Sequence, residues 1–122
     1  MSEKPERDIM REIQVALSDP TTRLFRMQSG SYELIDGRHI TVGFPGLSDL
    51  VGWHSVTITP EMVGRTVAVY TAIEVKSRRG KPTHQQLRFI EAVRNAGGLA
   101  GIARCIPEAR LITSLDPSTA KR

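Results

Sequence analysis

Hydrophobic and polar positions along this 122-residue chain follow two different periods, which together predict an α/β fold. Apolar residues between Pro5 and Leu17 recur at helical spacing, which predicts a first helix. Residues 22–28 alternate between apolar and polar, as in a half-buried strand. Asp36-Gly37 is a two-residue turn signal between SYELI and RHITV, and it predicts a hairpin.

The second half of the chain predicts further strands and a second long helix. Residues 47–53 should form a short strand, and residues 66–75 are apolar on both faces, as in a central strand covered on both sides. Thr59-Pro60 predicts a short helix between them. A helix from Thr83 to about Asn95 should stop at a glycine pair, and residues 99–106 predict a final strand. The order describes a sheet covered by helices on its faces.

Length and composition fit one soluble domain, which we place at residues 1–115, with a loose tail at 116–122. No apolar run approaches the ~18 residues of a membrane span, so we expect no membrane partner. The charged N-terminus lacks an apolar signal core, so we expect a cytoplasmic protein that is not secreted. The single cysteine, Cys105, excludes an internal disulfide, and within the predicted last strand it should be structural.

Positive charge is concentrated in one segment of the chain. The whole chain carries +4, but residues 62–104 hold eight basic residues against two acidic ones, a net +6. The remainder holds nine basic residues against eleven acidic ones, a net −2. A basic segment of this kind favours an anionic partner such as nucleic acid, although a solvated surface is the simpler alternative.

The end of the predicted central strand, AIEVKS, brings acid and base chemistry together. Glu74 and Lys76 are two residues apart and should share one face of the strand. If the strand after Asp49 pairs with it, two carboxylates and one ammonium converge, and the main-chain carbonyl of Val75 adds another oxygen. Such oxygens suit Mg²⁺, while Lys76 would orient the nucleophile or stabilise charge on the phosphorane. The alternative is a structural Glu–Lys pair.

Three segments in order give the chain a specific resemblance. GFPGLSDLVGW, VYTAIEVKSRRGKPTHQQLRFIEAV and GGLAGIARC resemble the VRR-NUC branch of the PD-(D/E)xK nucleases, in particular the small stand-alone members of phages and bacteria. The resemblance implies a restriction-endonuclease-like core, a central mixed β-sheet flanked by helices in the order α-β-β-β-α-β. It also implies an Mg²⁺- or Mn²⁺-dependent endonuclease in a bacterial or phage-infected cell.

Residues of this sequence match the family pattern one at a time. Asp49 falls on the first metal aspartate, Glu74 on the acid of the E-x-K motif and Lys76 on its lysine. Ser48 replaces the proline of the superfamily name. The first helix of the family usually contributes another acid, and we choose Glu6 over Glu12, because Glu6 continues the apolar stripe of that helix.

Gln86 allows two interpretations from the sequence. Thr83-His84-Gln85-Gln86 fits a capping box, in which the Gln86 side chain accepts a hydrogen bond from the Thr83 N–H. Gln86 also begins the apolar stripe of the predicted helix, and similar nucleases place a helix glutamine beside the catalytic lysine. Both interpretations stay open at this point.

Basic residues near the predicted site are expected to bind DNA phosphates. The loop after the E-x-K strand supplies Arg78, Arg79 and Lys81. The segment FRMQSG supplies Arg26 and Ser29, since the first strand should lie at the same edge of the sheet. The resemblance implies a homodimeric resolvase of four-way (Holliday) junctions. The alternatives are a non-catalytic DNA-binding module with a nuclease fold and a nuclease acting on flap or duplex DNA.

Overall fold

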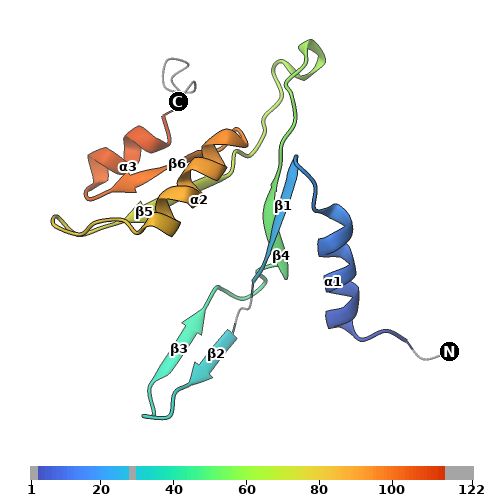
Figure 1. Ribbon diagram of the computed structural model, residues 1–122, viewed down its shortest axis with the longest axis vertical. Helices are drawn as coiled ribbons and strands as arrows, with labels where there is room; N and C mark the ends of the chain where they lie inside the picture. Colours follow the sequence, from blue (N-terminus) through green and yellow to red (C-terminus); the bar gives the residue numbers. More distant parts are fainter. Residues whose placement is uncertain (1–2, 28–29, 115–122) are drawn as a thin grey trace. The chain divides into compact units, whose positions relative to one another are not determined.

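The computed structural model describes residues 3–27 and 30–114, and the chain forms two compact units (Figure 1). Unit 1 extends to Val56 and unit 2 begins at Thr57. The single domain over residues 1–115 stays a prediction, and the predicted tail at 116–122 lies outside the described residues. No helix in the described part of the chain combines the length and apolar character that crossing a membrane requires.

Unit 1 consists of one helix followed by strands that pair in antiparallel fashion. Its elements are α1 (Glu6–Leu17), β1 (Thr22–Arg26), β2 (Gly30–Glu33), β3 (His39–Val42) and β4 (Leu50–His54). The helix, the first strand and the Asp36-Gly37 hairpin are confirmed, the hairpin being β2–β3. β4 begins three residues later than predicted, because the ladder with its partner β1 ends where Arg26 lies opposite Leu50.

The pairing of β1 with β4 forms the framework of unit 1. Arg23 lies opposite Trp53, and Leu24 lies opposite Gly52. Glycine is needed at position 52, because a Cβ there would lie 1.9 Å from the Arg23 carbonyl oxygen. Gln14 of α1 donates a hydrogen bond from its side chain to the Leu24 carbonyl oxygen at 3.1 Å. That bond joins α1 to β1.

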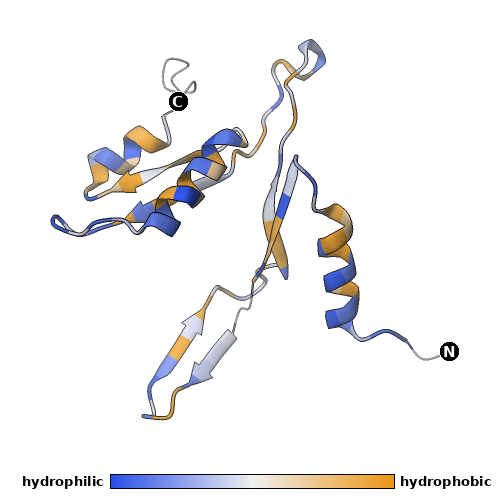
Figure 2. Cartoon of the chain, viewed as in Figure 1, coloured by the Kyte–Doolittle hydropathy of each residue, from blue (hydrophilic) through white to orange (hydrophobic). Residues whose placement is uncertain are grey.

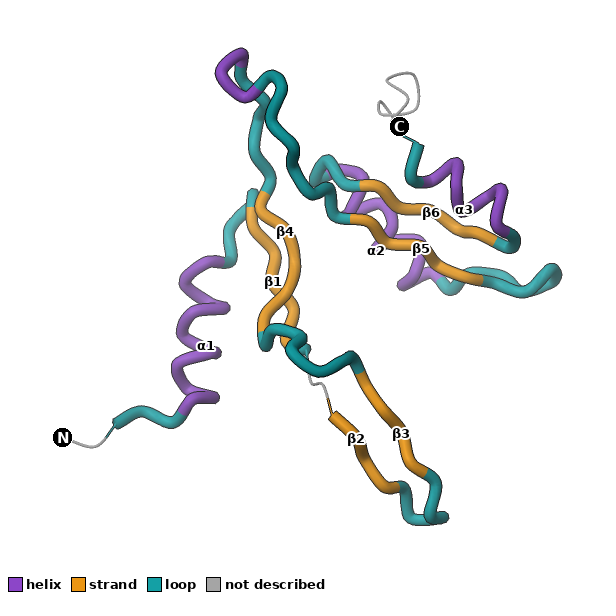
Figure 3. Tube along the Cα trace, turned by 180° about the vertical axis from the view of Figure 1, so that it is seen from behind, coloured by secondary structure: helices purple, strands orange, loops and turns teal. Residues whose placement is uncertain are grey.

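Unit 2 is a parallel strand pair with a helix crossover. Its elements are η1 (Pro60–Met62), β5 (Thr71–Val75), α2 (His84–Asn95), β6 (Leu99–Ala103) and α3 (Ile106–Ile112). β5 and β6 lie side by side with α2 between them in the sequence (Figures 1 and 3). A parallel pair requires such a crossover connection, and the predicted helix from Thr83 to Asn95 supplies it.

Two strand predictions in unit 2 are wrong in length. β5 starts at Thr71 rather than Thr66. Its partner β6 begins at Leu99, whose N–H donates to the Tyr70 carbonyl oxygen, and this bond ends the ladder on that side. β6 ends at Ala103 rather than Ile106, because Pro107 favours the first turn of a helix. The apolar residues after Ala103 therefore belong to α3.

The core of unit 2 is small and lies where helices pack against β6. Ile90 and Val93 of α2 are buried, as are Ala100 and Ala103 of β6. Apolar and polar residues occupy different sides of α2 (Figure 2). Val75, on the face of β5 away from α2, is 73% exposed, so the prediction of a strand covered on both sides is wrong. With the predicted helices and strands in place, the fold class is α/β.

Candidate functional site

Glu74 and Lys76 lie on the face of the β5–β6 pair that α2 covers. Glu74 is opposite Ile102 in the ladder. Gly98 lies on the same face, and an added Cβ at Gly98 would meet Val93, which shows that α2 packs on this face. The Lys76 ammonium nitrogen lies 3.7 Å from Glu74 Oε2, and the side chains are 19% and 31% exposed. The predicted shared face is confirmed. Partial burial strengthens the pair compared with one in open water.

The main chain of β5 offers a carbonyl oxygen at the open edge of the pair. The Lys76 N–H donates to the Ala103 carbonyl oxygen, and Tyr70 accepts from Leu99, so even-numbered residues of β5 bond to β6. Because alternate residues of a strand point their N–H and C=O groups to opposite edges, the Val75 carbonyl points away from β6. β5 pairs with β6 alone among the described strands. Val75 therefore has the orientation that a main-chain ligand needs.

The basic loop after β5 is held by an arginine from the end of β6. Gly80 donates its N–H to the Ser77 carbonyl oxygen at 3.1 Å, which closes a turn. Arg104 Nη2 then donates to the Gly80 carbonyl oxygen at 2.8 Å. Arg78 and Arg79 are exposed within this turn, and Lys81 follows it, also exposed. The three predicted DNA-binding residues of this loop therefore lie together on one anchored segment.

Gln86 forms the capping box at the start of α2. Its Oε1 accepts from the Thr83 N–H at 2.9 Å, and its own N–H donates to Thr83 Oγ1 at 3.1 Å. The capping interpretation is confirmed. The cap uses the amide oxygen of Gln86 and leaves the function of its amide nitrogen open, so a catalytic contribution of Gln86 stays a prediction.

Asp49 lies in unit 1, directly before β4. The preceding loop is a turn in which the Leu47 N–H donates to the Phe44 carbonyl oxygen, with Pro45 second and Gly46 third at φ +90°. A positive φ at the third position is typical of a type II turn and favours glycine. The Met27 N–H donates to the Asp49 carbonyl oxygen at 2.8 Å, and the Asp49 side chain is exposed.

The two candidate acids of α1 occupy different sides of the helix. Met10 and Gln14 are half-buried on the side that faces β1, and Glu6 precedes Met10 by about one turn on that side. Glu12 projects elsewhere and forms an ion pair with Lys4. Glu6 is exposed, so its contribution to a metal site stays a prediction.

The structure joins some of the predicted residues and leaves others in different units. It joins Glu74, Val75 and Lys76 with the basic loop in unit 2, while Asp49, Glu6 and Arg26 belong to unit 1. Ser29 lies outside the described residues. Within residues 3–27 and 30–114, no three His, Cys, Asp or Glu side chains are close enough together to hold a metal ion.

The comparisons with known proteins identify the family. The family model described as the VRR-NUC domain matches residues 24–106, more than half of the chain. The chain belongs to the VRR-NUC domain family. Searches of curated proteins and of solved structures gave no match. A VRR-NUC domain is a restriction-endonuclease-like nuclease domain, so the protein hydrolyses phosphodiester bonds and its substrate is DNA.

Several residues in the matched region suit a divalent ion by their chemistry. Asp49 and Glu74 carry carboxylates with exposed or half-exposed side chains, and Val75 adds a carbonyl at an open strand edge. All three are hard oxygen donors, the type that Mg²⁺ and Mn²⁺ prefer. The donor chemistry therefore fits the metal that the VRR-NUC resemblance implies.

Two features of the VRR-NUC domain were missed by the sequence prediction. Arg104 was counted only as a positive charge, whereas it anchors the basic loop through Gly80. Cys105, predicted to lie in a strand, is exposed and occupies the N-cap position of α3 without a side-chain capping bond, because β6 ends two residues earlier. An arginine directly after a short strand was the available signal, but its partner is a main-chain carbonyl 24 residues away.

Proposed function

We propose that this chain is a divalent-metal-dependent endonuclease that resolves four-way DNA junctions as a homodimer. The observation that carries the proposal is the Glu74–Lys76 pair at the end of β5, followed by the arginine-anchored basic loop. Within eight residues, the chain places a carboxylate that could bind a metal, an ammonium and a basic loop that could bind phosphate, which together suit metal-assisted hydrolysis of a DNA backbone. The membership of the VRR-NUC family supports the same chemistry.

The metal would be held by Glu74, the Val75 carbonyl and Asp49, with Glu6 as a further ligand. When bound, it would neutralise phosphate charge and lower the pKa of a bound water, which supplies hydroxide near neutral pH. Lys76 is half-buried beside Glu74, and in the proposed reaction it orients the attacking water or stabilises negative charge on the phosphorane. The Gln86 amide nitrogen is a further donor at the start of α2.

The basic loop gives DNA affinity without sequence reading. Arg78, Arg79 and Lys81 are exposed and form no ion pair with another described residue. Guanidinium groups match phosphate oxygens in two-point contacts, and such contacts fix the position of the backbone. A site that reads shape rather than sequence is suited to branched DNA.

The homodimer follows from the symmetry of the proposed substrate. A four-way junction is resolved by two cuts in strands of equal polarity, and this chain carries one E-x-K motif. A two-fold dimer would present two identical sites to the two strands. A chain of 122 residues also offers limited surface for a large branched DNA, which a second copy doubles.

The test is cleavage of a substrate panel by the purified protein. Labelled four-way junction, flap and linear duplex are incubated with Mn²⁺, with Mg²⁺ and with EDTA. We expect metal-dependent cuts in the junction that yield two nicked duplexes. Preferred cleavage of the flap or duplex would overturn the junction assignment, and DNA binding without cleavage in any metal would favour the non-catalytic module.

A further inference from the structure

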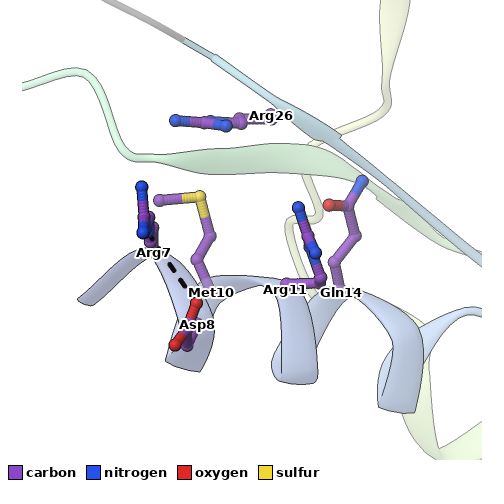
Figure 4. Close-up of a pocket in the computed structure, with 6 residues that line it drawn as sticks. All are labelled: Arg7, Asp8, Met10, Arg11, Gln14 and Arg26. Atoms are coloured by element: carbon purple, nitrogen blue, oxygen red, sulfur yellow. Dashed lines mark ion pairs between the residues drawn. The ribbon is translucent and has the colours of Figure 1, made fainter. Parts of the chain in front are cut away.

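Three arginines of unit 1 line one hollow between α1 and β1 (Figure 4). Arg7 and Arg11 are four residues apart and therefore share one face of α1, and Arg26 is the last residue of β1. The hollow has a volume of about 480 Å³. Its lining residues are Arg7, Asp8, Met10, Arg11, Gln14 and Arg26.

The hollow is a built feature of unit 1, because hydrogen bonds fix α1 beside β1. Gln14, in the lining itself, donates to the Leu24 carbonyl oxygen. At the connection between the two elements, the Asp19 carboxylate accepts from the N–H and the hydroxyl of Thr21, both at 2.7 Å. The bond from the Thr21 hydroxyl holds the pKa of Asp19 below its ordinary value. Arg26 is fixed in turn by pairing opposite Leu50.

The charges around the hollow are unbalanced. Asp8 is the one acid in the lining, and its Oδ1 lies 3.9 Å from Arg7 Nε, a weak contact. Neither Arg11 nor Arg26 forms an ion pair with another described residue. Three cations and one anion leave a net +2 around one hollow. Like charges at helical spacing of four destabilise the free protein, and a bound anion would relieve that repulsion.

A phosphate group is the anion that these side chains recognise best. Guanidinium groups bind phosphate oxygens through paired N–H donors, and several arginines around one hollow can share a phosphate. A small metabolite would need apolar or aromatic contacts as well, and Met10 is the one apolar side chain in the lining. The simpler alternative is that Arg7 and Arg11 lie on a solvated helix face. That alternative does not explain why Arg26, from a different element, lines the same hollow.

We propose that Arg7, Arg11 and Arg26 form a phosphate-binding site for the backbone of the DNA substrate, on elements other than those that carry Glu74 and Lys76. The inference rests on the proposed function, because it takes DNA as the ligand. It extends the DNA contact predicted for Arg26 to two arginines of α1. The site contacts phosphate and therefore adds affinity without sequence preference.

The test is the salt dependence of DNA binding by the full chain. Labelled four-way junction is titrated in EDTA, which prevents cleavage, between 50 and 200 mM salt for the wild type and for a variant carrying Arg7→Gln, Arg11→Gln and Arg26→Gln. Each lost phosphate contact lowers the slope of log affinity against log salt by about 0.9. We expect a slope smaller by about one to three and an affinity at least tenfold lower.

Matched variants separate the site from net charge and from folding. Arg38→Gln also removes one positive charge from unit 1, but the Arg38 guanidinium is already paired with Asp36 at 2.7 Å. Arg11→Gln alone should weaken binding several-fold, and Arg11→Lys, which keeps the charge, should restore most of it. If Arg11→Gln binds DNA as tightly as Arg38→Gln does, with both variants folded by circular dichroism, the inference is wrong.

Two further measurements separate this inference from the proposed function. Absence of cleavage by the wild type overturns the proposed function, whereas arginine-dependent DNA binding would still support the site. Calorimetric titration with inorganic phosphate tests whether the site binds a free phosphate ion instead of a DNA phosphate. If phosphate binds in an arginine-dependent manner while DNA affinity is unchanged in the triple variant, the site binds a free phosphate and the DNA assignment is wrong.

Discussion

Lys76 and Glu74 are separated by 3.7 Å on the covered face of β5, and this arrangement sets what each can contribute to hydrolysis. In the proposed mechanism, the pair would supply a metal ligand and a cation at neighbouring positions. Removing one member should affect catalysis far more than DNA affinity.

Replacing Lys76 should slow the chemical step without weakening binding. Lys76→Met removes the ammonium that we propose stabilises charge on the phosphorane, and a lost stabilising group of this kind costs about 10²- to 10³-fold in kcat. Single-turnover cleavage of the junction at saturating protein measures the effect. Lys81→Met is the matched control, since Lys81 lies in the exposed loop and should lower affinity instead. A Lys76→Met variant that cleaves at the wild-type rate would remove Lys76 from the mechanism.

One substitution distinguishes the capping role of Gln86 from its proposed catalytic role. Gln86→Glu retains the side-chain oxygen that accepts from Thr83, so the capping box and the thermal stability should be preserved. It removes the amide nitrogen, so cleavage should fall if that nitrogen contacts the reacting groups. Thr83→Ala is the complementary variant, expected to cost about 1 kcal/mol of unfolding free energy while retaining activity. Full activity in Gln86→Glu would leave Gln86 a helix cap alone.

At the scale of elements, the connection between β5 and α2 depends on the end of β6. Arg104 bonds the Gly80 carbonyl oxygen, and its own N–H donates to Glu108 Oε1 of α3 at 2.7 Å. Three segments of unit 2 therefore meet at one arginine. The basic loop is anchored at Gly80, while its arginines are exposed for DNA.

Removing the Arg104 side chain should loosen this loop. Arg104→Gln is expected to speed cleavage by trypsin after Arg78 and Arg79, because a protease needs a locally extended chain. Mass spectrometry of a limited digest identifies the cut. Arg110→Gln of α3 changes the charge equally and is the control. Equal digestion of the two variants would show that the Arg104 bond does not restrain the loop.

The elements most accurately predicted from the sequence are those whose signals are local. The capping box at Thr83 and the apolar stripe through Ile90 predicted α2 within a residue, and Asp36-Gly37 predicted the hairpin. Strand lengths were less predictable, because the length of β5 depends on how far β6 extends. The Ile106-Pro107 helix start was missed because an apolar residue after a strand is read as its continuation.

The site shows the same division between local and non-local signals. Glu74 and Lys76 were predictable together, since two-residue spacing in a strand fixes a shared face. The arginine hollow was not predictable, because Arg7, Arg11 and Arg26 are brought together only when α1 packs on β1. The spacing of four between Arg7 and Arg11 was visible in the sequence, but it is typical of any solvated helix face.

At the scale of the whole molecule, we expect two chains to act together. Light scattering after gel filtration should give twice the mass of the 13.5 kDa chain. Mixed dimers of wild type and Glu74→Gln should nick a junction in one strand without resolving it, because each subunit cuts one strand. Full resolution by a monomer in single-turnover conditions would contradict the dimer.

Metal-dependent catalysis at Glu74 is tested by junction cleavage with wild type and Glu74→Gln, measured with Mn²⁺ and with EDTA. Glu91→Gln, which removes an exposed carboxylate of α2, is the matched control. We predict that wild type and Glu91→Gln resolve the junction in Mn²⁺ only, while Glu74→Gln binds it and cleaves at least about 10³-fold more slowly. Cleavage by Glu74→Gln at the wild-type rate, or wild-type cleavage in EDTA, would contradict the account.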